Sequence, residues 1–122
     1  MKSITILGVN NTSIKMFIDF YKTIYLPSIH PDIITLNSLN SLDVIESIIT
    51  ESLEAVSDFK FYTLKVKENY KAENLPSMLV ENSDIVIRFD NSNLEPELIK
   101  LPEPYQPIID RWNQNIERMS HL

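Results

Sequence analysis

The stretch FYTLKVKENYKAENLPSMLVENSDIVIRF, residues 61–89, decides how the rest of the chain is interpreted. Its first part belongs to a run at residues 59–67 that is rich in aromatic and β-branched residues, which predicts a strand. The polar segment ENYKAEN follows as a connection. Two further apolar runs then flank ENSD, a group of turn-forming residues. This arrangement predicts a β-hairpin that begins directly after Pro76.

Before this stretch, apolar strands alternate with amphipathic helices. Residues 3–9 and 32–36 are short apolar runs that predict strands. A helix capped by Thr12 or Ser13 is expected between them. The next helix is expected to be capped by Asn40 or Ser41, with a buried side formed by Leu42, Ile45, Ile49, Leu53 and Val56.

After this stretch, two more helices are expected. Ser92 or Asn93 would cap a short helix with Pro96 in its first turn. Residues 101–122 form a proline-led C-terminal helical extension. Its inner side is expected to comprise Ile108, Ile109, Trp112, Ile116 and Met119. The order β-α-β-α-β, then a β-β hairpin and a C-terminal helix, predicts a single α/β domain over residues 1–122 with a mixed sheet.

Composition narrows the functional classes. The 122 residues suffice for one hydrophobic core, and 17 acidic against 11 basic residues give a net charge of −6. Because the basic residues form no stripe, we expect no direct binding to nucleic acid. No apolar run approaches the roughly 20 residues that a membrane span needs. The N-terminal apolar run is too short for a signal peptide, so a cytoplasmic location and no membrane partner are expected.

The residue types that are missing exclude several chemistries. There is no cysteine, so disulfides, thiolate nucleophiles and cysteine zinc sites are excluded. His30 and His121 are far apart in the sequence and form no metal-ligand motif. The only glycine is Gly8, which weighs against a glycine-rich phosphate loop. We therefore expect neither a metal nor a cofactor, although the helix that follows GVNNTS could still bind an anion at its N-terminus.

The element order, with a proline directly before the predicted hairpin, resembles the thioredoxin superfamily. Leu75, Pro76 and Ser77 match the apolar residue, cis-proline and Thr or Ser of that family. The resemblance implies that Ser38 and Ser41 occupy the positions of the two redox cysteines, with Asp32 as the buried acid. Serine cannot replace a thiolate in disulfide exchange, so this chain would be a redox-inactive member. The chain also departs from the family in its shortened helix before Pro76 and its lack of glycines around the hairpin.

Two related families share parts of the pattern. The segments LPSMLVENSDIVI and NSNLEPELI resemble the N-terminal domain of glutathione transferases, in which Ser92 would hold the glutamate of glutathione. Asn91 departs from the Glu or Gln usual there, and Ser13 or Thr12 would lie near the thiol. The β-α-β opening and the hairpin are also similar to thioredoxin-like subunits of mitochondrial ribosomes and respiratory complexes, which are often basic.

The function expected from these features is non-catalytic: a protein-binding accessory factor or a small subunit of a larger assembly. The candidate partner-binding residues are Ser38, Ser41, Leu75, Pro76, Ser77, Tyr105, Arg111 and Trp112. For two of them a structural role is an open alternative, because Ser41 would also cap a helix and Trp112 would also close the core. The alternative function is a ligand-binding or enzymatic domain of the glutathione-transferase type.

Overall fold

The structure is a computed structural model that describes residues 1–90 and 94–120. The strands are β1 (Ser3–Gly8), β2 (Asp32–Asn37), β3 (Lys60–Lys65), β4 (Ile85–Phe89) and β5 (Glu97–Lys100). The helices are α1 (Asn11–Tyr25), α2 (Leu42–Glu54), α3 (Ser77–Glu81) and α4 (Gln106–Ser120), with short 3-10 helices η1 (Ala72–Asn74) and η2 (Glu103–Tyr105). The predicted α/β class with a mixed sheet is confirmed.

The sheet is organised around its first strand. The strand order is β2-β3-β1-β4-β5, so β1 lies in the centre. It pairs in parallel with both β3 and β4, while β2 pairs in parallel with β3. Among the described strands, only β5 runs antiparallel, next to β4. All six residues of β1 are buried, which fits a central strand with helices on both faces, and the buried hydroxyls of Ser3 and Thr5 have hydrogen-bond partners.

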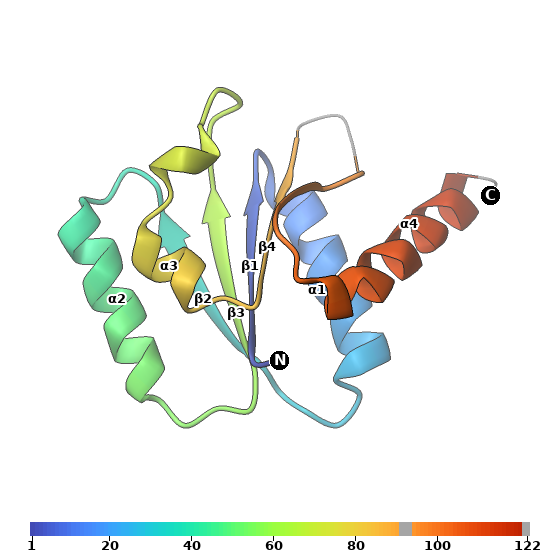
Figure 1. The fold of residues 1–122 in the computed structure, drawn as a ribbon, viewed down its shortest axis with the longest axis horizontal. Helices are drawn as coiled ribbons and strands as arrows, with labels where there is room; N and C mark the ends of the chain where they lie inside the picture. The colour runs from blue at the N-terminus through green and yellow to red at the C-terminus, as the bar shows by residue number, and fades with distance from the viewer. Residues whose placement is uncertain (91–93, 121–122) are drawn as a thin grey trace.

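Helices cover both faces of this sheet. In Figure 1, α2 and α3 lie on one side of the sheet, and α1 and α4 lie on the other. Alternate strand residues enter the two cores: Ile4, Ile6 and Phe61 pack towards α1 and α4, whereas Leu7 and Leu64 pack towards α2 and α3. This alternation follows from the two-residue period of a strand. The first core is the more aromatic, and Phe17 contacts Phe20, Tyr21, Phe89 and Trp112 there.

The hairpin predicted directly after Pro76 is wrong. Residues 77–81 form the helix α3, and Pro76 is its N-cap residue, a part of a helix that tolerates the missing N–H of proline. Leu79 N donates to Pro76 O at 3.0 Å, which closes the first turn. The ENSD segment then connects α3 to β4, so this is a helical crossover between the parallel strands β3 and β4. The antiparallel pair is β4 with β5 instead.

Contacts that are distant in sequence hold this crossover in place. The carboxylate of Asp84 accepts hydrogen bonds from Lys2 N at 2.6 Å and from Ser3 N at 3.1 Å. Thr5 and Ser83 share a buried hydroxyl–hydroxyl bond of 2.6 Å. These bonds place the start of β4 beside the start of β1, and therefore fix their parallel register.

Other local predictions also need correction. Asn10, not Thr12 or Ser13, caps α1, because its side chain accepts from Ser13 N at 3.2 Å. The short helix predicted after Ser92 or Asn93 is wrong where the structure describes it, since residues 97–100 are β5. The two proposed cap residues lie outside the described part of the chain.

The predicted buried sides of two helices are only partly correct. In α2, Ile45, Ile49 and Ser52 are buried, whereas Leu42 and Leu53 are exposed, because the short α3 and the edge strand β2 leave those positions uncovered; Val56 lies beyond the end of the helix and is also exposed. In α4, Ile108, Ile109 and Trp112 are buried, Ile116 is partly buried and Met119 is exposed. The C-terminal helix therefore supplies part of the same core as α1.

Gly8 is required for packing and not for an unusual backbone angle. None of the described residues has a positive φ. A Cβ built on Gly8 would lie 2.7 Å from Ile14 Cγ1 and 3.0 Å from the carbonyl oxygen of Asn10. The glycine therefore allows the start of α1 to approach the end of β1 closely.

Replacing Gly8 with Ala should destabilise the protein by about 1–3 kcal/mol, the usual cost of overpacking. The free energy of unfolding in urea measures this loss. Ile14→Ala removes both Ile14 atoms that the new methyl group would meet, so Gly8→Ala should cost clearly less in that background. An equal cost in both backgrounds would contradict the steric explanation.

The hydroxyl of Tyr21 lies in the aromatic core. It donates to Met1 Sδ at 3.6 Å, and its ring stacks on Tyr25 with the centroids 4.8 Å apart. Burial, followed by smaller effects of Tyr25, Tyr105 and Asp84, raises the pKa of Tyr21 from 10.0 to about 12. The protonated phenol is therefore favoured in the folded state relative to the unfolded state.

This shift predicts a loss of stability at high pH. Between pH 10 and 12 the unfolded chain releases the Tyr21 proton while the folded chain keeps it, so the free energy of unfolding falls as pH rises. The slope due to this group is at most about 1.4 kcal/mol per pH unit. Urea unfolding of Tyr21→Phe should show a shallower decline over that range. The same decline in both proteins would contradict the assignment.

Candidate functional site at the carboxyl edge of the sheet

A candidate site lies at the carboxyl ends of the neighbouring strands β1, β2 and β3. The chain leaves β1 through α1 on one face of the sheet and leaves the neighbouring β3 through α3 on the other face (Figure 1). In open α/β sheets, ligands bind outside the carboxyl ends of strands where connections diverge in this way. The topology therefore directs attention to this edge.

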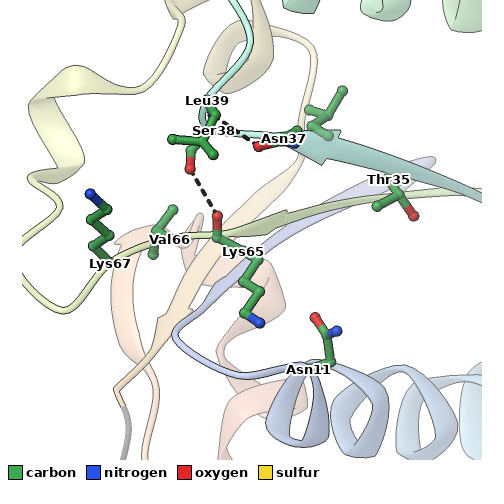
Figure 2. A pocket seen from close by; sticks show the side chains of 9 residues that line it. Asn11, Thr35, Asn37, Ser38, Leu39, Lys65, Val66 and Lys67 are labelled. Atoms are coloured by element: carbon green, nitrogen blue, oxygen red, sulfur yellow. Dashed lines mark hydrogen bonds between the residues drawn. The ribbon is translucent and has the colours of Figure 1, made fainter.

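A cavity of about 360 Å³ lies at this edge. It is lined by residues 35–39 from β2 and its following turn, by residues 65–67 from the end of β3, and by Asn11, the first residue of α1 (Figure 2). Its lining combines apolar side chains with amide, hydroxyl and ammonium groups. No carboxylate or imidazole is among the lining residues.

Hydrogen bonds fix the turn that forms one wall. Asn37 Oδ1 accepts from Leu39 N at 2.9 Å, and the Asn37 carbonyl accepts from Asn40 N at 3.0 Å. The hydroxyl of Ser38 donates to the carbonyl of Lys65 at 3.1 Å, which ties the turn to the end of β3 (Figure 2). Asparagine and serine thus shape this turn without a glycine.

Two lysines give the cavity a positive charge within an acidic protein. In Figure 2 the side chain of Lys65 extends towards Asn11, whereas that of Lys67 points the other way. Neither lysine forms an ion pair with another residue that the structure describes. Lys65 is therefore the cationic group available to the interior of this cavity.

Arg88 fixes the loop that continues from this cavity to Pro76. Its side chain is only 6% exposed and donates to the carbonyls of Tyr70 and Glu68, the latter at 2.8 Å. Its Nε atom lies 3.4 Å from a carboxylate oxygen of Asp90. The planar guanidinium can hold two carbonyls at once, whereas a lysine ammonium offers no such fork.

The predicted site residues are divided among three locations. Ser38 lines the cavity, and Ser41 is the N-cap of α2, where its hydroxyl accepts from Val44 N at 3.4 Å. Leu75 and Pro76 are buried, and Ser77 is exposed at the start of α3. The Leu75–Pro76 peptide is trans, so it does not match the cis-proline that the thioredoxin resemblance implies.

The aromatic group at the C-terminus does not form a joint surface as predicted. Trp112 is completely buried, and its indole N–H donates to Leu94 O at 2.9 Å. Tyr105 is partly buried against the same core, and Arg111 is exposed. The predicted partner contact through Trp112 is therefore corrected to a role in the core, as ring contacts with Phe17, Phe20 and Phe89 also indicate.

The remaining residues implied by the thioredoxin and glutathione-transferase resemblances have different surroundings from those expected. Ser13, proposed near a glutathione thiol, is only 3% exposed, and its hydroxyl donates to atoms of Asn10. Asp32, implied as a buried acid, is exposed. Ser92 and Asn91 lie outside the described residues. The glutathione alternative therefore loses its contact at Ser13, whereas Thr12, the other residue expected near the thiol, is exposed.

A second feature at this side of the molecule is the exposed surface of α2. At 100° per residue, Leu42, Glu46 and Leu53 follow one line along the helix. Leu42 and Leu53 are 55% and 46% exposed, and Leu39 in the preceding turn is 81% exposed. The helix contains four acidic residues and no lysine or arginine: Asp43, Glu46, Glu51 and Glu54. We define the α2 surface as Leu42, Leu53 and these four acids.

The thioredoxin resemblance pointed to Ser38, and GVNNTS, the segment considered for anion binding, contains Asn11, whereas no pattern in the sequence marked Lys65 or Asn37 as site residues. The sequence feature that could have located these residues is that three predicted strands end there. Parallel strands bring their carboxyl ends to one edge of the sheet. No group of three or more histidine, aspartate or glutamate side chains that could hold a metal occurs in the described ranges. No helix in the described part of the chain is long and apolar enough to cross a membrane.

Comparisons with protein-family models, with curated proteins and with solved structures gave no match to this chain. The thioredoxin resemblance therefore stays a prediction.

Replacing Arg88 with Met should leave two loop carbonyls without their donors and lower stability by about 2 kcal/mol. Arg88→Lys should restore only part of this loss, because an ammonium cannot reproduce the fork. Urea unfolding measures the loss, and amide hydrogen exchange should become faster in residues 66–76 of Arg88→Met. Unchanged exchange in that loop would contradict the anchoring role.

Proposed function

We propose that the protein is a non-catalytic, redox-inactive module that binds a basic protein partner through the α2 surface. The observation that carries this proposal is that Leu42 and Leu53 are exposed on one line of a helix whose charged residues are all acidic. Exposed apolar residues with charged residues around them are typical of interaction surfaces.

Charge indicates the kind of partner. The α2 surface carries four acids without a basic residue, and the whole chain carries −6. A partner surface with lysines or arginines around apolar side chains would be attracted by this charge and would cover the leucines. A nucleic acid would be repelled by the same surface.

The proposed function is the one expected from the sequence, but the proposed binding site is the α2 surface and not the residues predicted first. Ser38 and Ser41 flank the exposed Leu39 directly before α2, so the α2 surface begins next to the expected vestigial redox edge. Burial of Leu75, Pro76 and Trp112 argues against using the other two expected regions. Membership of the thioredoxin-like superfamily remains part of the proposal and is supported only by the β-α-β-α-β opening.

The test compares capture of partners from native extract by three forms of the chain. Leu42→Ser combined with Leu53→Ser should abolish binding of the partner, because both side chains are exposed and their loss should not disturb the core. The matched control is Leu98→Ser, which changes another leucine that is 44% exposed but lies in β5. Circular dichroism verifies that all three forms are folded.

Two further results decide the proposal. The captured protein should bind the purified chain directly, and added salt from 50 to 300 mM should weaken that binding because exposed charges are screened. Equal capture by the double variant and the wild-type chain, or affinity that does not change with salt, would overturn the proposal.

A further inference from the structure

We propose that the cavity at the carboxyl ends of β2 and β3 is a separate site for a small organic anion with an apolar or aromatic part. This site is independent of the α2 surface and needs no protein partner. The cavity of about 360 Å³ lies within the range of small-ligand sites.

The charge of the lining indicates an anion. The cavity has Lys65 and Lys67 in its lining and no acid, although acidic residues outnumber basic ones in the chain by 17 to 11. The Lys65 ammonium extends along the cavity towards the side chain of Asn11 (Figure 2). Asn37 uses its Oδ1 to accept from Leu39 N, which leaves its amide N–H groups as further donors.

The apolar part of the ligand follows from the other lining residues. Leu39, which is 81% exposed, contributes hydrocarbon surface next to these donors, while the nearly buried Leu36 and Val66 close the wall behind it. A bare inorganic anion would leave this surface in contact with water. An anion that carries a ring or a short alkyl group would cover it and gain roughly 25 cal/mol for each Å² removed from water.

The backbone narrows the choice of anion. Nucleotide phosphates are commonly cradled by glycine-rich loops, and no described residue here has a positive φ. Lys65 instead acts as a point charge, which suits a single phosphate or carboxylate group. The ligand class is therefore a monophosphorylated or carboxylated small molecule, not a dinucleotide or nucleoside triphosphate.

The experiment is a titration of the isolated protein followed by amide chemical shifts, with phenyl phosphate, benzoate, inorganic phosphate and phenol as probes. Phenyl phosphate or benzoate should give saturable shifts in residues 35–39 and 65–67 at low millimolar concentration. The probe that binds more tightly shows whether the site prefers a phosphate or a carboxylate group. Inorganic phosphate and phenol should each bind at least about tenfold more weakly, because each lacks one half of the recognised chemistry.

Two variants control this titration. Lys65→Gln should weaken the binding of phenyl phosphate or benzoate by about tenfold, because one charge-assisted contact is lost. Lys60→Gln lies at the opposite end of the same strand and should have no effect. The proposal is overturned by shifts that do not saturate by about 20 mM, by equal losses in the two variants, or by phenol binding as tightly as the anions. Because no partner is present, none of these results bears on the α2 surface.

Discussion

Strand β1 is hydrogen-bonded to β3 on one edge and to β4 on the other, and all six of its residues are buried. This double pairing constrains the rest of the molecule. The chain must travel from β1 over β3 to reach β2, and later from β3 over β1 to reach β4. These two crossovers need opposite faces of the sheet, so α1 and α3 lie on opposite sides. The cavity at the carboxyl edge lies between the first residue of α1 and the ends of β2 and β3.

The chain forms its turns and close backbone contacts with a single glycine. Its single glycine provides space for the packing of α1 on β1, while Asn37 and Arg88 fix the loops at the carboxyl edge by hydrogen bonds to backbone groups. Such loops are specified by side chains with defined partners. They can therefore hold a cavity open without the positive φ angles that glycine-rich binding loops use.

Sequence alone predicted the first half of the fold well, because residues 3–9 and 32–36 are short apolar strands and Ser41 is a strong helix cap. It failed after Pro76 because the run Met78–Val80 is too short to distinguish strand from helix by periodicity. The contacts that decide this segment, from Asp84 to Lys2 and Ser3, join residues about 80 positions apart. No local pattern reports them.

The candidate site was predictable to a similar extent. Ser38 was identified through the thioredoxin resemblance, whereas Lys65 is one of several scattered lysines and gains significance only through the cavity it lines. The exposure of Leu42 and Leu53 was missed because helical periodicity shows which residues share a side, but not how far a neighbouring element extends over it. Trp112 was equally compatible with a surface or a core until the rings around it were placed.

The central claim is that this protein works by binding a partner through α2, on the side of the sheet away from its C-terminal helix. Hydrogen–deuterium exchange of the chain in its native complex, compared with the free chain, tests this most directly. The account predicts that complex formation slows exchange in residues 39–54 and leaves α4 unchanged. Protection confined to α4 or β5, with α2 exchanging at its free rate, would contradict it.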